Sequence, residues 1–384
     1  MLIIHGRPFV DGVLKENVNI RIENGLIQDL SPSLSPLAGE DVLDAQGDYL
    51  LPGFVDEHIH GFQGHDTMYG GTSVRFMSRA LYQMGVAAFL PTTMSASIAD
   101  TRKAIEGIRS VMDHPEEDGA MVVGAHMEAP FMAKEKCGAQ VKEHFCNPSM
   151  DTFHQMTGGD VHAVRMITLA PELEGAEAFV RGVTAQGVRV SIGHTCADGE
   201  TTHHAASWGA THVTHTFNAQ TPLSHRAPGV PGAALTDDRL YTEMICDGIH
   251  HRPVIARMAI DAAGTDRICL VTDAMAATGQ GDGRYLLGEL EVEVRDGTAR
   301  LVTADGTPGS IAGSTLTMAK AFSFVVGRVG LSIPEAARIA ATTPARWHGL
   351  AEVGTLEAGK RADICVVDDA GELQQVWRRG ERIR

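Results

Sequence analysis

Residues 51–61 read LPGFVDEHIHG, a short apolar run that ends in two histidines one residue apart. In an extended strand, residues i and i+2 point to the same side. If residues 54–58 form a strand, the imidazoles of His58 and His60 face one point just beyond its end. Neutral imidazole is the commonest side-chain metal ligand, so the pair can be half of a metal site. With 18 histidines in 384 residues, one such pair can also arise by chance.

Seven further apolar runs follow, at residues 86–93, 120–128, 163–172, 188–195, 211–217, 241–248 and 267–274. Segments with helical periodicity, such as SVRFMSRALYQMG (73–85), separate many of them. Buried strands that alternate with helices are typical of a parallel sheet, and eight of them predict an α/β protein with a (β/α)8 barrel. A doubly wound open sheet is the alternative, disfavoured because no G-x-G-x-x-G follows the first run.

The two ends of the chain differ from the middle in the pattern of their apolar runs and turns. Short β-rich runs and turns fill residues 1–50, with Asn24-Gly25 as a hairpin signal, and the same pattern returns near the C-terminus. Neither end carries enough apolar surface to fold alone. We therefore predict that residues 1–52 and 346–384 together form a small β-sandwich beside a barrel of residues 53–345.

The composition is that of a globular protein, with 43% hydrophobic and 21% charged residues. The formal net charge of −16 argues against nucleic acid and against an anionic membrane as the main partner. The first ten residues lack the features of a signal peptide, and no stretch approaches the roughly 20 apolar residues of a membrane helix. Six scattered cysteines without C-x-x-C spacing indicate reduced thiols, so we expect a cytoplasmic protein.

Ligand-type side chains stand where the apolar runs end, which in a (β/α)8 barrel is where the chemistry lies. Imidazoles beside a carboxylate suit Zn2+, Fe2+ or a similar ion. Such an ion lowers the pKa of water towards ~7 and polarises a carbonyl, as amide or ester hydrolysis requires, and an aspartate would then move the proton. The residues are His58 and His60 on the first run, Glu128 on the third, His194 on the fifth, His215 on the sixth and Asp273 on the eighth.

Longer motifs resemble one family over essentially the whole chain. Its most specific part is THTFNAQTPLSHRAPGVPGAAL (214–235). Together with HMEAPF (126–131), SIGHT (191–195), DGIH (247–250), LVTDA (270–274), AGSTLTM (312–318) and GTLEAGKRADICVVD (354–368), this block resembles the N-acetylglucosamine-6-phosphate deacetylases of the amidohydrolase superfamily. The resemblance implies a (β/α)8 barrel with a β-sandwich from both termini, and hydrolysis of N-acetylglucosamine 6-phosphate to glucosamine 6-phosphate and acetate.

The resemblance also implies a cofactor. Glu128, His194 and His215 would hold one divalent ion, and His58 and His60 would complete a second site that some members have. One or two ions per subunit are expected, with Zn2+ favoured over Fe2+ or another first-row metal.

The substrate contacts are implied in the same way. His250 would bind the substrate and polarise its amide carbonyl, and Asp273 would be the general acid and base. Arg226 would reach the phosphate from the neighbouring subunit of a homodimer. Further contacts are expected from Asn218, Ala219, Gln140, Gly313 and Ser314.

Three positions depart from the family pattern. Gln140 stands where a histidine near the substrate is usual, which bears on phosphate recognition. Residues 220–221 are Gln220-Thr221 where the family usually has an apolar residue. Ala129 stands where the family has a glycine, next to the expected metal ligand Glu128. A relative that acts on another N-acetyl amino sugar, such as N-acetylgalactosamine 6-phosphate, is therefore an alternative.

Other function classes are weaker alternatives. Cyclic amidases often bridge their metals with a carboxylated lysine at the fourth strand end, where this chain has residues 169–172, LAPE. Deaminases of this fold usually lack a ligand like Glu128, which disfavours that activity. A non-catalytic metal-binding protein is disfavoured by Asp273, because a closed structural metal site does not need a base beside an open coordination position. Three lysines could assist an anion, but solvated positions are the simpler expectation for them: Lys134, Lys136 and Lys142.

Overall fold

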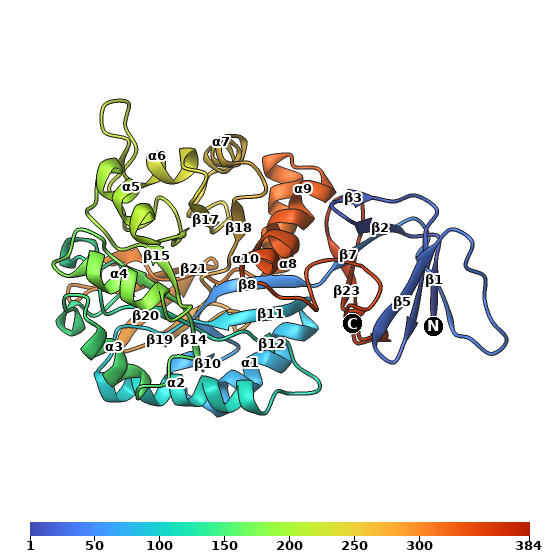
Figure 1. Cartoon of the computed structure of the whole chain (residues 1–384), viewed down its shortest axis with the longest axis horizontal. Coiled ribbons are helices and arrows are strands. Elements are labelled where there is room, and N and C mark those ends of the chain that lie inside the picture. Colours follow the sequence, from blue (N-terminus) through green and yellow to red (C-terminus); the bar gives the residue numbers. More distant parts are fainter.

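The larger part of the molecule is a closed barrel of parallel strands (Figure 1). The computed structural model describes residues 1–384, and each of the eight apolar runs contains one barrel strand. Parallel bridges between Thr92 and His126 and between Ile59 and Ala274 join two hydrogen-bonded sheets into a ring. The predicted (β/α)8 barrel is confirmed. Its strands are β8 (Phe54–Ile59), β11 (Val86–Pro91), β13 (Ala125–Glu128), β14 (Val164–Leu169), β15 (Arg189–Ile192), β16 (His212–Val213), β17 (Tyr241–Met244) and β18 (Ile268–Leu270), with β12 (Met121–Val122) beside β11.

Helices cover the outside of the barrel (Figure 1). The first one buries Val74, Met77 and Leu81, which are spaced three and four residues apart and so share one face. None of the helices combines the length and apolar character that a membrane crossing requires. The α-helices are α1 (Gly71–Gln83), α2 (Ile98–Asp113), α3 (Met150–Thr157), α4 (Ala176–Thr184), α5 (Gly199–Trp208), α6 (Gly229–Thr236), α7 (Pro253–Ala263), α8 (Met318–Phe324), α9 (Ile333–Ala337) and α10 (Thr343–Trp347). Three short 3-10 helices are η1 (Thr67–Tyr69), η2 (Lys134–Lys136) and η3 (Lys142–His144), and two π-helical segments are η4 (Val325–Val329) and η5 (Arg338–Thr342).

Both termini contribute to a smaller β-domain at one end of the barrel (Figure 1). The C-terminal strand β23 (Ile364–Val367) pairs with β7 (Tyr49–Pro52), which leads directly into the first barrel strand. Apolar side chains from both ends, such as Ile20, Leu50 and Trp377, share one core. The predicted β-sandwich is confirmed as a fold, while its boundaries at residues 52 and 345 stay a prediction. Its other strands are β1 (Leu2–Ile4), β2 (Arg7–Val10), β3 (Val13–Leu14), β4 (Asn19–Glu23), β5 (Leu26–Ser31), β6 (Val42–Asp44), β24 (Leu373–Arg378) and β25 (Glu381–Arg382).

An antiparallel sheet that the sequence pattern does not predict lies between β18 and α8. Its strands are β19 (Gly283–Leu287), β20 (Leu290–Arg295), β21 (Thr298–Val302) and β22 (Pro308–Ile311). Leu287 and Val292 pack with Met94 and Met275, which follow barrel strands β11 and β18. The sheet therefore covers part of the barrel mouth. A separate antiparallel hairpin of two strands, β9 (Gly61–Phe62) and β10 (His65–Asp66), follows the first barrel strand.

Candidate active site

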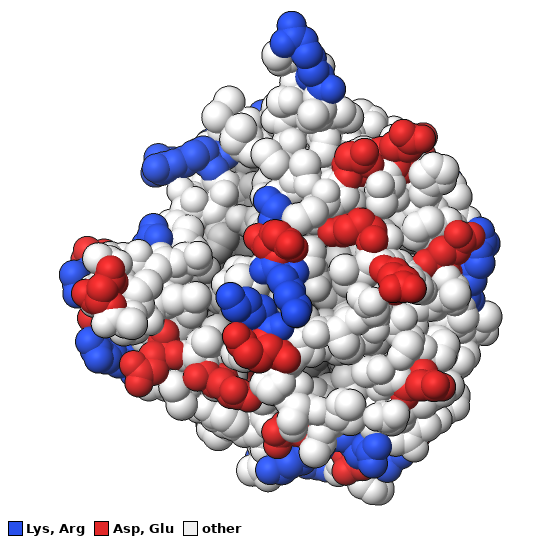
Figure 2. Space-filling model, turned by 90° about the vertical axis from the view of Figure 1, so that its left-hand side faces the viewer, with Lys and Arg blue, Asp and Glu red and all other residues white.

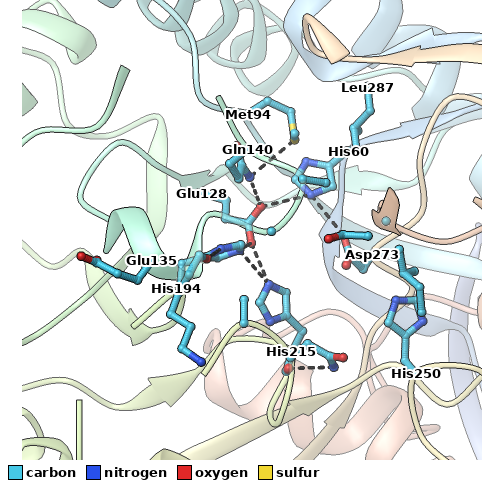
Figure 3. Close-up of a pocket in the computed structure, with 18 residues that line it drawn as sticks. His60, Met94, Glu128, Glu135, Gln140, His194, His215, His250, Asp273 and Leu287 are labelled. Carbon is cyan, nitrogen blue, oxygen red and sulfur yellow. Dashed lines mark hydrogen bonds and ion pairs between the residues drawn. The ribbon is translucent and has the colours of Figure 1, made fainter. Parts of the chain in front are cut away.

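The ends of five barrel strands bring the predicted metal ligands and Asp273 into one buried cluster, of which Figure 3 shows all members except His58. The backbone of His194, His215 and Asp273 has positive φ angles of 47°, 27° and 49°. Such angles are uncommon for residues other than glycine and cost free energy, of order 1–3 kcal/mol each, so they persist only where the surrounding structure holds them. The chain is thus bent at three strand ends in the residues that carry the polar groups.

Glu128 lies at the centre of this cluster and contacts two pairs of histidines. Its Oε1 atom is 3.1 Å from His194 Nε2 and 3.0 Å from His215 Nε2. Its Oε2 atom is 3.3 Å from His60 Nε2, and His58 Nε2 lies 3.7 Å from Oε1. Within each pair the Nε2 atoms approach to 3.2 Å, for His194 and His215, and 3.3 Å, for His58 and His60. Four imidazole nitrogens therefore converge on one carboxylate.

The opposite ring nitrogen of three of these histidines is held by an acceptor. His58 Nδ1 donates to Glu243 Oε2 at 2.9 Å, His194 Nδ1 to the Lys136 carbonyl at 2.8 Å, and His60 Nδ1 to the Thr92 carbonyl at 3.3 Å. A proton fixed on Nδ1 leaves the Nε2 lone pair free for a metal ion, as in most histidine-ligated sites. The donor set, its convergence and this outer layer all fit one or two first-row divalent ions.

The carboxylates around the cluster give it an excess of negative charge that a cation can balance. Burial by itself would lower the pKa of His58, but Glu243, Glu128 and Asp273 raise it to about 9. Burial is likewise overcome at His60, whose pKa Asp273 and Glu128 raise to about 10. In a metal-free chain these imidazoles hold protons that balance the carboxylates. A bound divalent ion displaces such protons and supplies the positive charge instead.

Asp273 lies at the edge of the cluster, with Oδ1 3.2 Å from His60 Nε2 and 3.6 Å from His58 Nε2. Burial would raise the pKa of its carboxyl, but His58 and His60 lower it to about 2, so the group is ionised at neutral pH. Its main chain is fixed on both sides: the Asp273 N–H donates to the His58 carbonyl at 2.8 Å and its carbonyl accepts from Ser314 N at 2.7 Å. Gly313, in the left-handed region at φ 57°, lets the next loop approach Asp273 closely.

His250 forms a second acid–imidazole pair on the cavity wall. Its Nδ1 donates to Asp247 Oδ2 at 2.6 Å, while Asp247 Oδ1 accepts the N–H groups of Ile249 and His250 at 2.8 and 2.7 Å. Burial would lower the pKa of His250, but the hydrogen bond and charge of Asp247 raise it. The pair therefore favours a protonated imidazole at the cavity.

The cluster opens into a cavity of about 300 Å³. Lys136 is the only lysine or arginine among its lining residues, and its Nζ donates to the Gln220 carbonyl at 3.0 Å. Lys134 and Lys142, by contrast, are exposed, so the solvated position expected for all three lysines is wrong for Lys136. Other residues with predicted substrate roles line the cavity as well: Gln140, Asn218, Ala219, His250 and Gly313, with Ser314 in the adjoining recess.

Arg226 is the predicted site residue that this chain does not bring to the cavity. It is exposed on the loop between β16 and α6, which projects from the barrel beyond α5 and α6 (Figure 1). Figure 2 shows the end of the molecule where the barrel strands finish, with side chains of both charges and no continuous basic surface. Within one chain, Lys136 is thus the permanent cation at the cavity.

Several functional contacts come from residues that carry no motif of their own. The acceptors for His60 and His194 are main-chain carbonyls, which any residue supplies, so the sequence contains no signal for them. Asp247 is different, because it belongs to the DGIH motif three residues before His250. That spacing is the signal from which the acid–imidazole pair could have been predicted.

Comparisons with known proteins agree with this geometry. The sequence model of the amidohydrolase family matches residues 49–383. The N-acetylgalactosamine-6-phosphate deacetylase of Escherichia coli O157:H7 is 35% identical over 367 residues, which cover 94% of this chain and 93% of the relative. The N-acetylglucosamine-6-phosphate deacetylase of Homo sapiens is 37% identical over 353 residues, covering 88% and 84%. A mutant of N-acetyl-D-glucosamine-6-phosphate deacetylase from Mycobacterium smegmatis, solved in complex with N-acetyl-D-glucosamine-6-phosphate, superposes with a TM-score of 0.90 at 32% identity and covers 100% of this chain and 98% of that chain.

Proposed function

Because this chain belongs to the amidohydrolase family, we propose that it hydrolyses the N-acetyl group of an amino-sugar 6-phosphate. The main candidate reaction converts N-acetylglucosamine 6-phosphate and water to glucosamine 6-phosphate and acetate. One observation carries this proposal: a cluster of five metal-ligand side chains and an ionised aspartate opens into a cavity whose only lysine or arginine is Lys136. The cavity thus combines groups for amide hydrolysis with a cation for an anionic sugar.

The proposed cofactor is one or two divalent ions per subunit, with Zn2+ favoured over Fe2+ or another first-row metal. Glu128, His194 and His215 would hold one ion, and His58 and His60 with Glu128 would hold the other. An ion there supplies a Lewis acid and lowers the pKa of water towards ~7. All six cysteines are free, in keeping with the cytoplasmic location that we also propose.

The proposed chemistry assigns the proton transfers to Asp273. Its ionised carboxylate takes a proton from the attacking water as the new carbon–oxygen bond forms, and returns it to the amide nitrogen as the carbon–nitrogen bond breaks. His250, protonated through its contact with Asp247, donates to the amide carbonyl oxygen. A donor aimed at the developing negative charge stabilises the transition state more than the substrate.

The phosphate would be recognised from two sides. Lys136 lies on the cavity wall, next to the 218–220 turn whose Gln220 carbonyl it contacts. The N–H groups of Ala219 and Gln220 in this turn donate to no group of the protein, so they are free to bind an anion. Arg226 would add the second cation from the neighbouring subunit of a homodimer, because it lies on a loop that projects away from its own cavity.

A second candidate substrate is N-acetylgalactosamine 6-phosphate. A relative with this named activity matches 94% of the chain. Gln140 also departs from the histidine that the resemblance to the N-acetylglucosamine-6-phosphate deacetylases implies at this position. The two sugars differ only in the orientation of one hydroxyl group, so they share the amide and phosphate contacts described above.

Acetate release from a panel of N-acetylhexosamines, each with and without a 6-phosphate, tests the proposal. We expect turnover with a phosphorylated N-acetylhexosamine and at least about tenfold lower kcat/KM with its free form, since a charged hydrogen bond contributes about 1.5–3 kcal/mol. Equal rates on free and phosphorylated sugars would contradict the phosphate assignment. No release from any member of the panel would contradict the deacetylase proposal.

A further inference from the structure

The side chain of Gln140 touches the central carboxylate of the metal cluster (Figure 3). Its Nε2 donates to Glu128 Oε2 at 2.6 Å, and its Oε1 accepts the backbone N–H of Ser95 at 2.7 Å. The remaining Nε2 hydrogen points towards Met94 Sδ at 3.7 Å. The side chain is buried, with 6% of its surface exposed, so all its polar atoms are engaged by the protein.

The Ser95 contact decides which way the carboxamide points. A backbone N–H can only donate, so it must face the amide oxygen of Gln140 and not the amide nitrogen. The NH2 group is then directed at Glu128 Oε2, which as a carboxylate oxygen can only accept. Both contacts are lost if the amide is flipped, so the orientation of this group is fixed by the chain itself.

The oxygen that Gln140 contacts is the one that faces His60. Glu128 Oε1 lies between His194 and His215, whereas Oε2 lies 3.3 Å from His60 Nε2. A carboxylate oxygen has about two lone-pair directions, so one hydrogen bond from Gln140 leaves one direction on Oε2 for an ion. The contact thus holds the carboxylate with one oxygen turned to each histidine pair.

We propose that Gln140 is a positioning residue that holds Glu128 as a bridge between two metal ions, so that the chain binds two ions per subunit. This inference rests on the metal centre of the proposed function. It assigns the Gln140 amide to Glu128, where the resemblance implied a contact with the substrate. Because a glutamine side chain does not titrate, the donor that it offers to Glu128 is the same at every pH, unlike that of an imidazole.

Ion binding to metal-stripped protein tests the inference without any substrate. Mn2+ is titrated into wild type and into Gln140→Met, which has a similar length and no donor. We expect two ions per subunit for wild type, and for the variant one ion of unchanged affinity and a second bound about 10- to 100-fold more weakly, as outer-layer partners typically contribute. Met94→Leu, which alters the packing against the same Nε2 atom, is the matched control and should bind two ions like wild type.

An electron paramagnetic resonance spectrum of the Mn2+-loaded protein tests the bridge itself. Two ions that share a carboxylate, about 3.5–4 Å apart, give an exchange-coupled spectrum, and isolated ions do not. We expect coupling in wild type and Met94→Leu, and its loss in Gln140→Met and in Gln140→Asn, whose shorter amide withdraws from Glu128. Gln140→His, which restores an N–H donor, should recover part of the coupling.

Two results would overturn the inference. One is a wild-type subunit that binds a single ion at saturation. The other is a Gln140→Met or Gln140→Asn variant that binds two coupled ions with wild-type affinity. Either result leaves acetate release by the wild type unaffected, so a failure of this inference is distinguishable from a failure of the proposed function.

Discussion

Two buried clusters of histidine and carboxylate occupy the same barrel, and only one of them has the surroundings of a metal site. The first is the Glu128 cluster at the strand ends. The second, the Glu57 cluster, consists of Glu57, His212 and His348, with Glu57 Oε2 2.9 Å from His348 Nε2. The triad Glu128, His194 and His215 of the first cluster and the three residues of the second each place their potential ligand atoms within 4.8 Å of one another. Proximity of ligand-type atoms therefore does not separate them.

The charges around the two clusters do separate them. In the first, carboxylates raise the pKa values of His58 and His60, which shows a local excess of negative charge. In the second, burial lowers the pKa of His348, and the nearby Arg189 and Arg165 lower it further despite Glu57. Burial and positive neighbours lower the pKa of His212 as well. A divalent ion is attracted by the first environment and repelled by the second.

Access also differs between the clusters. Glu128, His194 and His215 line the cavity, whereas none of the three residues of the Glu57 cluster lines it. The Glu57 cluster is thus a neutral imidazole network around one carboxylate that packs against Arg165 and Arg189. The difference shows that a metal site requires an excess of negative charge and an open side, in addition to the right donor atoms.

Removing the central carboxylate should have the largest effect. Glu128→Ala takes a shared ligand from both histidine pairs, so we expect loss of bound metal and of at least about 1000-fold in turnover, because the ion contributes several kcal/mol to the transition state. Metal content is measured by elemental analysis and turnover by acetate release. A variant that keeps its metal and its turnover would remove the distinction between the two clusters.

Asp273→Asn should keep the metal and lose the proton transfer. The amide is close in shape but cannot take up a proton at neutral pH, and a general acid–base group contributes about 10²–10⁴-fold. We therefore expect normal metal content with turnover reduced by that factor. Near-normal turnover at normal metal content would show that another group moves the proton.

Lys136→Met tests whether the cation at the cavity wall binds the phosphate of the substrate. Loss of a hydrogen bond to a charged group costs about 1.5–3 kcal/mol, so kcat/KM for a phosphorylated N-acetylhexosamine should fall by about tenfold to a hundredfold. The fall should lie mainly in KM and be absent for the free sugar. Lys134→Met, in the same short turn but exposed, is the control. An equal fall in both variants would mean that only the overall charge matters.

Asp247→Asn should change the pH dependence more than the maximal rate. Asp247 raises the pKa of His250, and the protonated form exists below that pKa and is lost as the pH rises through it. Without the carboxylate, the loss of activity at high pH should begin at a lower pH. The maximal rate should fall by about fivefold, because a neutral hydrogen bond is about 1 kcal/mol weaker than a charged one. Asp261→Asn, on the exposed face of α7, should leave the profile unchanged.

His348→Leu should have the smallest effect on turnover and metal content, which we expect to stay at the wild-type level. Its effect is on stability, because it leaves a buried carboxylate oxygen of Glu57 without its hydrogen-bond donor, and an unsatisfied buried polar group costs about 1–3 kcal/mol in the free energy of unfolding. Chemical denaturation measures that cost. A fall in bound metal at normal stability of the fold would show that the Glu57 cluster is a metal site after all.

The two clusters also show which features of the molecule can be predicted from the sequence and which cannot. The barrel and the ligands at its strand ends follow from apolar runs and from the polar residue at the end of each run, because parallel strands finish at one face. Strand alternation places Glu57 on the opposite side of its run from His58 and His60, but it does not show whether Glu57 meets other ligand-type residues there. Burial and charge from Arg165 and Arg189, which are distant in sequence, distinguish the Glu57 cluster from a metal site.

Other features depend on tertiary contacts in the same way. Lys134, Lys136 and Lys142 look equivalent in the sequence, and only the 218–220 turn packed against Lys136 places that one at the cavity. The β19–β22 sheet is built from short strands whose buried residues, Leu287, Val292 and Val294, pack against barrel residues Met94 and Met275 as well as within the sheet. Its position over the mouth therefore has no local signal.

The most direct test of the central claim follows acetate release and bound metal in one titration. Protein stripped by chelation and dialysis is mixed with N-acetylglucosamine 6-phosphate, Zn2+ is added in steps, and acetate is followed by proton NMR. We predict no acetate before metal is added, then a rate that rises with bound metal and levels off by two ions per subunit. Full activity in a preparation shown by elemental analysis to be metal-free would contradict the account.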